Sequence, residues 1–227
     1  MVFGMCSISS SKKSSSKVYY PDMPLSFLVL NGGSSTTKFA LFHAESLECL
    51  SSGVVEEVGV FDPIREAVGE KTDLKDIQAV GHRIVHGGTE FSAPTLLTED
   101  VLEKLEKLST LAPEHVPRQL NLVRSALQAF PEALQVGCFD TAFHRTMPSR
   151  AKCVALPRDL TDKHQVQRFG FHGLSYAFIL QELQKISSEE ADGRLVVCHL
   201  GHGASMAAVK GGECHRRRWG SVLQVEL

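Results

Sequence analysis

The stretch LVLNGGSSTTKFALF (residues 28–42) decides the fold prediction for this chain. An apolar run stops at Asn31, two glycines and a run of hydroxyl residues follow, and a second apolar run begins after Lys38. This pattern predicts two antiparallel strands joined by a tight turn. The glycines, Gly32 and Gly33, allow an anion to approach the backbone N–H groups closely. An ordinary glycine- and serine-rich hairpin turn fits the same residues, so the stretch alone leaves both interpretations open.

The chain carries a second copy of this pattern. In RLVVCHLGHGASMAAVK (residues 194–210), an apolar run again enters a glycine turn at 201–203 and a second apolar run follows. Two such units indicate an internal duplication. Two phosphate-binding hairpins that face each other across a cleft would hold a nucleotide polyphosphate from both sides.

Composition limits the classes of protein to consider. The 227 residues, 43% of them hydrophobic, suffice for one large domain or one and a half smaller ones. A net charge of −2 argues against a nucleic-acid or membrane partner, and no apolar run approaches the roughly 18 residues of a membrane span. The six cysteines form no CxxC pair, which favours reduced thiols in an intracellular, cytoplasmic protein over a zinc site.

The first 24 residues differ from the rest of the chain. They are rich in serine and lysine and contain no acidic residue before Asp22. A transit peptide for organelle import has such a composition. A disordered tail, or a start codon assigned too early, fits equally well.

Hydrophobic periodicity predicts alternating strands and helices. Strands are expected at residues 25–30, 38–42, 78–85, 134–139, 195–198 and 206–209. Helices are expected at residues 99–111, 117–129 and 173–186. The alternation predicts an α/β fold, and the hairpin that begins each domain favours a mixed sheet over a purely parallel one.

Three polar residues stand where apolar ones are expected. Arg83 lies inside a predicted strand, where it needs an anionic partner: a bound carboxylate or phosphoryl group, or a structural salt bridge. Asp140 follows the strand at 134–139, a position suited to a magnesium ion or a nucleophile, but also to a turn cap. His172, between Phe171 and Gly173, could donate a hydrogen bond to transition-state charge or be a core residue.

Together these segments resemble the acetate kinase family of acyl-phosphate-forming kinases. The matching stretches are LVLNGGSSTTKFALF, GHRIVHGG, LAPEHVP, FDTAFHRTMP, RFGFHGLS and HLGHGASMAAVKGG, in order and at the expected spacing over residues 25–212. The resemblance implies an actin-like (ribonuclease H-like) duplicated fold, with two βββαβαβα domains around a nucleotide cleft. The first domain would be complete and the second only begun.

The resemblance also implies an enzyme, a phosphotransferase, and roles for single residues. Asn31 would help to bind Mg²⁺, and Lys38 would contact the phosphates of ATP, the co-substrate. Arg83 would hold the substrate or the moving phosphoryl group, Asp140 would act as acid/base or position the metal, and His172 would stabilise the transition state. The second phosphate loop would comprise His199, Leu200, Gly201, His202 and Gly203.

The implied reaction converts acetate and ATP reversibly into acetyl phosphate and ADP, and the full-length family implies a homodimer. His202, Glu114 and Tyr176 depart from the residues common in the family. These departures keep a propionate or butyrate kinase open as an alternative. A truncated, non-catalytic phosphate- or nucleotide-binding fragment is the other alternative.

The expected organisation has four parts. Residues 1–24 form the tail or transit segment, residues 25–192 the first domain with an inter-domain segment, and residues 193–212 the first hairpin of a nucleotide domain. Residues 213–227 do not match the family and read as a frameshifted end. A lone first hairpin would expose apolar strand edges, so we expect poor solubility and little kinase activity.

Overall fold

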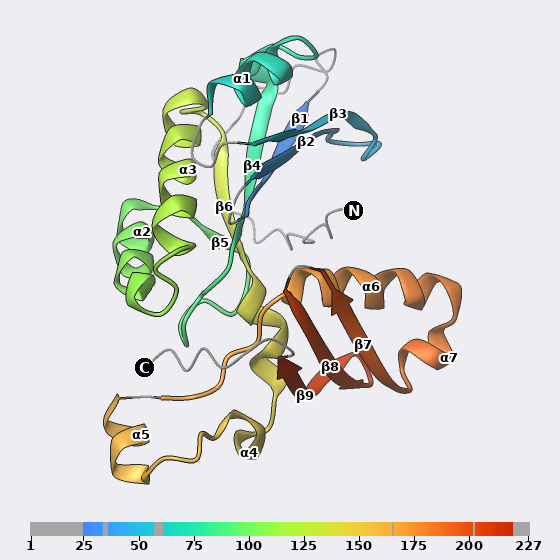
Figure 1. Cartoon of the computed structure of the whole chain (residues 1–227). Coiled ribbons are helices and arrows are strands. Elements are labelled where there is room, and N and C mark those ends of the chain that lie inside the picture. The colour runs from blue at the N-terminus through green and yellow to red at the C-terminus, as the bar shows by residue number, and fades with distance from the viewer. Residues whose placement is uncertain (1–24, 34–35, 57–60, 165, 202, 220–227) are drawn as a thin grey trace, which may run out of the picture. The chain divides into compact units, whose positions relative to one another are not determined.

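The computed structural model describes residues 25–33, 36–56, 61–164, 166–201 and 203–219. These residues divide into two compact units (Figure 1). The N-terminal unit runs to residue 84 and resumes at 94–138, whereas the C-terminal unit comprises 85–93 and the chain from 139 onward. The predicted segment 1–24 lies outside the described residues. Within the described part, no helix has the length and apolar character of a membrane span.

A mixed sheet of six strands forms the N-terminal unit. Its order is β3-β2-β1-β4-β6-β5, with β1 at Ser26–Gly32, β2 at Thr37–His43, β3 at Cys49–Val55, β4 at Ile77–Ile84, β5 at Thr95–Leu96 and β6 at Leu134–Phe139. β1 pairs antiparallel with β2 and parallel with β4. Both the hairpin and the mixed sheet predicted from the sequence are therefore confirmed.

Helices pack against one face of this sheet. α1 (Asp62–Gly69) and α3 (Val116–Ala129) contribute Ile64 and Leu122 to the same buried cluster as Leu30 of β1. α2 (Glu99–Glu106) begins where predicted but passes at residue 107 into the 3₁₀ helix η2 (Lys107–Thr110), and another 3₁₀ helix, η1 (Leu74–Asp76), precedes β4. With β5 and α2 inserted between β4 and α3, the order β1-β2-β3-α1-β4-α3-β6 follows the βββαβαβ pattern that the resemblance implies.

The C-terminal unit is built on a smaller antiparallel sheet. It contains η3 (Asp140–Thr146), α4 (Ser149–Lys152), α5 (Arg158–His164), α6 (Gly173–Ile186), α7 (Ser188–Ala191), and the sheet of β7 (Arg194–Leu200), β8 (Ala204–Lys210) and β9 (Glu213–Trp219). α6 lies beside this sheet (Figure 1). Tyr176 and Leu180 of α6 share a core with Ala207 and Val209 of β8. The predicted helix 173–186 and the second hairpin are confirmed.

The C-terminal strands extend further than predicted. β9 pairs antiparallel with β8 and buries Cys214, inside the segment expected to be a frameshifted end. The two compact units meet along the chain at residues 84–85, 93–94 and 138–139, whereas the sequence predicted domain boundaries at 192 and 212. Those boundaries, and the frameshift, stay predictions.

Candidate functional site

Three predicted site residues of the N-terminal unit share one face of its sheet. Asn31 on β1 lies directly opposite Lys38 on β2, and opposed residues of an antiparallel pair point to the same face. Arg83, on the neighbouring β4, donates a hydrogen bond from Nη1 to Oδ1 of Asn31 at 2.9 Å. The structure thus brings together the predicted metal, phosphate and substrate residues of this unit.

The first glycine turn is closed by its own backbone. The N–H of Gly33 donates to the carbonyl of Thr36 at 2.8 Å, so this donor is engaged within the turn. Buried Gln119, on α3, donates from Nε2 to the carbonyl of Gly32 at 3.0 Å. Because this bond joins α3 to the end of β1, the helix fixes where the turn begins. Residues 34 and 35 of the turn lie outside the described part.

Two predicted catalytic residues of the C-terminal unit lie on backbone segments that touch each other. Asp140 is 1% exposed and begins η3, immediately after β6. Gly173, the first residue of α6, approaches it so closely that an added Cβ would lie 2.0 Å from the carbonyl oxygen of Asp140. Glycine is required at this contact, and His172 immediately precedes it. Residues 32 positions apart in sequence are thereby held at one place.

His172 is held by a small polar cluster. It adopts a left-handed backbone conformation (φ 58°) at the start of α6. Its Nδ1 lies 2.8 Å from Oγ of Ser205, and this buried hydroxyl lies 2.5 Å from the hydroxyl of Tyr176. The ring also stacks on His199, with 4.1 Å between centroids. The predicted transition-state residue and the first residue of the predicted second phosphate loop are thus neighbours.

Two described residues of the second loop are open to solvent. Leu200 is 80% exposed and Gly201 is exposed, whereas an added Cβ on Gly203 would lie 3.6 Å from Cε1 of His172. His202 lies outside the described residues. Arg83 and Asp140 belong to different units, and their roles in the same reaction stay predictions.

Sequence reasoning missed His144. This buried residue lies 3.0 Å from the carbonyl of Phe171 through Nε2, and 3.2 Å from Sγ of Cys214 through Nδ1. An added Cβ on Gly170 would lie 2.1 Å from Cγ of the His144 ring. His144 thereby positions the segment that carries His172. The glycine two residues before His172 was the available signal, because glycine permits such close packing.

Two other histidines are buried in their neutral form. His82 Nε2 lies 2.8 Å from Oε1 of Gln135, and its Nδ1 has no hydrogen-bond partner among the described residues. His86 packs edge-on against Phe169 and Phe171, and its Nδ1 accepts from the N–H of Gly88 at 2.8 Å. Burial lowers the pKa of both imidazoles to about 4.

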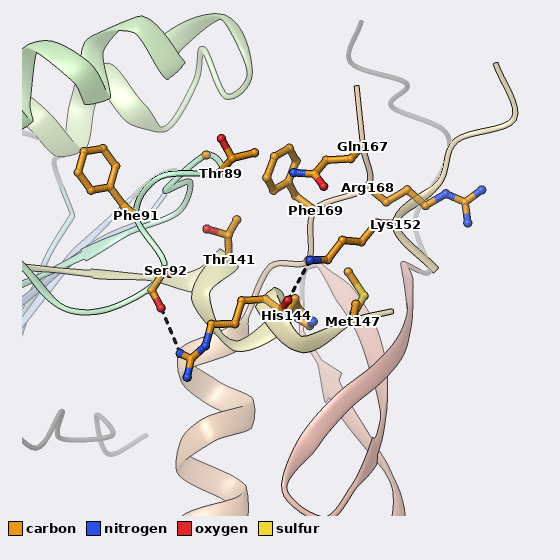
Figure 2. A pocket seen from close by; sticks show the side chains of 13 residues that line it. Thr89, Phe91, Ser92, Thr141, His144, Met147, Lys152, Gln167, Arg168 and Phe169 are labelled. Carbon is orange, nitrogen blue, oxygen red and sulfur yellow. Dashed lines mark hydrogen bonds between the residues drawn. The ribbon is translucent and has the colours of Figure 1, made fainter. Parts of the chain in front are cut away.

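A separate cavity of about 180 Å³ opens in the C-terminal unit (Figure 2). Its walls come from the loop at 88–92, from η3, from the end of α4 and from residues 167–170. Of the predicted catalytic residues, neither Asp140 nor His172 is among the residues that line it.

Known proteins resemble this chain in sequence and fold. The model of the Acetokinase family matches residues 60–220. An acetate kinase from Coprothermobacter proteolyticus is 38% identical over 222 residues, covering 83% of this chain and 56% of that protein.

Two solved structures of kinases are similar to this chain in fold as well as in sequence. The crystal structure of Porphyromonas gingivalis acetate kinase (TM-score 0.76, 33% identity) and that of a propionate kinase from Francisella tularensis (TM-score 0.78, 35% identity) each match 86% of this chain. The match covers 57% of each solved chain, so this chain spans little more than half the length of its relatives. The residues that the family model matches include the second glycine turn and the cluster around His172, and the chain belongs to the acetokinase family.

Proposed function

We propose that the residues of this chain serve the reaction of an acetate kinase, the reversible transfer of a phosphoryl group between ATP and acetate. The observation that carries the proposal is the close contact between Gly173 and Asp140, which joins Asp140 to His172 in one unit. The curated relative and one of the solved structures are named acetate kinases, which supports this reaction class.

The residue types suit this chemistry. A carboxylate substrate is already ionised at neutral pH, by analogy with side-chain carboxyl groups of pKa about 4, so no base is needed to activate it. Asp140 would therefore orient groups rather than remove a proton. Phosphoryl transfer depends on alignment and on neutralising the oxygens of the moving group. Arg83, oriented by Asn31, would supply positive charge, and His172, oriented by Ser205, would donate a hydrogen bond to these oxygens.

A divalent metal fits this chain only if the substrate and water supply most of the metal ligands. Among the described residues, no cluster of three or more His, Cys, Asp or Glu side chains could bind a metal. Mg²⁺ in kinases is held largely by water and phosphate oxygens, with one or two protein oxygens. Oδ1 of Asn31 accepts from Arg83 and keeps a second lone pair, so Asn31 would be a protein donor to the metal. The metal would neutralise phosphate charge.

The proposal also names acetate as the carboxylic acid substrate, which is a more specific claim than the reaction class. One solved relative is a propionate kinase at 35% identity, and Glu114 departs from the expected motif in this chain. Acetate, propionate and butyrate should therefore be compared by kcat/KM in the same preparation. A preference for a longer acid would keep the phosphotransferase and change its substrate.

Trapping the acyl phosphate with hydroxylamine tests the proposal. The 227-residue chain is assayed with ATP, Mg²⁺ and each acid, beside Asp140→Asn and Arg83→Gln. Removal of one transition-state contact costs on the order of a hundredfold in rate, so both variants should lose at least that much. ATP binding without turnover would instead identify a nucleotide-binding fragment, and turnover that is insensitive to Asp140→Asn would refute the proposed site.

A further inference from the structure

The cavity shown in Figure 2 is lined by positively charged side chains. Three cationic side chains, Arg145, Lys152 and Arg168, are among the residues that line it. Thr89, Ser92 and Thr141 add hydroxyl groups. None of the described residues that line the cavity is aspartate or glutamate. A cavity with such walls attracts anions and lacks a group of its own to neutralise them.

Neutral backbone carbonyls hold two of the cations in place. Lys152 donates from Nζ to the carbonyl of Arg145 at 2.9 Å, and Arg145 donates from Nη1 to the carbonyl of Ser92 at 3.1 Å. The backbone N–H of Arg168 donates to the carbonyl of Lys152 at 2.8 Å. These bonds fix the side chains without cancelling their charge, so the arrangement is set before a ligand arrives. Such preorganisation reduces the entropic cost of binding.

Lys152 and Arg168 point in different directions in Figure 2. The amino group of Lys152 points toward the space between Thr141 and Phe169, whereas the guanidinium of Arg168 points away from it. Lys152 therefore offers one charge to a ligand, and Arg145, which also lines the cavity, offers the second. The volume of about 180 Å³ exceeds the roughly 150 Å³ cavity that admits benzene in a well-studied engineered protein. A small organic molecule or a phosphate ion fits.

We propose that this cavity binds a small doubly charged anion, either a short dicarboxylate or phosphate. Two cationic groups match two negative charges, and the hydroxyl groups of Thr89 and Thr141 supply further donors. A monoanion such as acetate would leave one cation uncompensated. The site is separate from the proposed catalytic residues, so binding does not depend on the proposed reaction.

The cavity also adjoins the catalytic segments of its unit. Thr141 follows Asp140, and its Oγ1 accepts from the N–H of Gly87 at 3.0 Å. Phe169 lies three residues before His172. A bound dianion would therefore contact η3 and the segment that leads to α6, as an effector rather than a substrate.

Titration followed by NMR tests this site. The isotope-labelled 227-residue chain is titrated separately with succinate, inorganic phosphate and acetate at constant ionic strength. We expect succinate or phosphate to shift the backbone signals of Thr89, Thr141, Lys152 and Phe169, and acetate to bind at least about tenfold more weakly, a difference of about 1.4 kcal/mol. Which dianion binds more tightly identifies the ligand class.

Matched variants assign the binding to the cavity. Lys152→Gln and Arg145→Gln should each raise the Kd for the dianion about tenfold or more, because each removes one charge–charge contact. Lys152→Arg keeps the charge and should retain binding. Lys163→Gln, an exposed lysine of α5 outside the cavity, should leave the Kd unchanged. Equal affinity in Lys152→Gln, shifts confined to other residues, or no binding at millimolar concentration would each overturn the proposal.

Discussion

The surroundings of each histidine in this chain decide what its imidazole can do. His82 is surrounded by the core of the N-terminal unit, and protonation would place a charge on an Nδ1 that has no hydrogen-bond partner among the described residues. His172, by contrast, is half-buried and has a hydroxyl at Nδ1. The same side chain is therefore a neutral structural group at one position and a hydrogen-bond donor suited to catalysis at the other.

Acid should destabilise the fold through His82 and His86. Their folded pKa values of about 4 lie below the ordinary 6.5, so between these values the unfolded chain binds more protons. Stability is then complete above pH 6.5 and falls as the pH decreases toward 4. At pH 5 each residue should cost roughly 1–2 kcal/mol. Urea unfolding at pH 7 and pH 5 measures the difference.

A substitution pair assigns this pH effect. His82→Gln should reduce the dependence of the unfolding free energy on pH, because glutamine does not titrate. His164→Gln, at an exposed position of α5, should leave it unchanged. An unchanged slope in His82→Gln would contradict the assignment.

The hydroxyls of Ser205 and Tyr176 should act through His172. If a phenolic O–H donates to Ser205, the serine proton is directed to Nδ1, which leaves Nε2 of His172 protonated and able to donate to a phosphoryl oxygen. Tyr176→Phe and Ser205→Ala should lower kcat about tenfold with little change in KM. They should also change the ¹⁵N shifts of the His172 ring, whereas a purely structural role would leave those shifts unaltered.

At the scale of elements, hydrophobic periodicity located α3, α6 and both hairpins from the sequence. It missed β3 and α1, because two serines and a glycine interrupt the apolar residues of CLSSGVV, and α1 has only 8 residues with a proline in its first turn. Hydrophobic periodicity could not predict the contacts between the site residues. The bond between Arg83 and Asn31 joins residues 52 apart and depends on the pairing of β1 with β4, which no local pattern encodes.

Gly173 provides a test in which local and tertiary effects have opposite signs. Alanine favours a helix over glycine by about 1 kcal/mol, so Gly173→Ala would stabilise α6 taken alone. In the structure its Cβ would lie 2.0 Å from Asp140 O and should destabilise the fold by at least about 2 kcal/mol. Gly69→Ala in α1, where the nearest atom is 3.8 Å away, should be neutral or stabilising. Urea midpoints compare both, and a stabilised Gly173→Ala would contradict the contact.

At the scale of the whole molecule, one face of the C-terminal sheet is apolar and exposed. Val196, Leu200 and Met206 are 68%, 80% and 40% exposed, and they lie on the face opposite α6. Exposed apolar side chains that gather on one face promote self-association. We expect the chain to bind the dye ANS, and Val196→Thr combined with Leu200→Thr to reduce ANS fluorescence and aggregation measured by light scattering. If the double variant aggregated as much as the unmodified chain, this apolar face would not be the cause of aggregation.

The division into two units predicts separate responses to core damage. Leu30 belongs to the core of the N-terminal unit and Leu180 to that of the C-terminal unit, and the two clusters share no residue. Truncating a buried leucine to alanine costs about 2–5 kcal/mol. If each unit opens as its own cooperative element, Leu30→Ala should accelerate hydrogen exchange within residues 26–84 and 94–138 while exchange in α6 and β8 stays slow. Leu180→Ala should do the reverse. Mass spectrometry of peptic peptides resolves the two patterns, and faster exchange throughout the chain in both variants would mean that the two cores unfold as one.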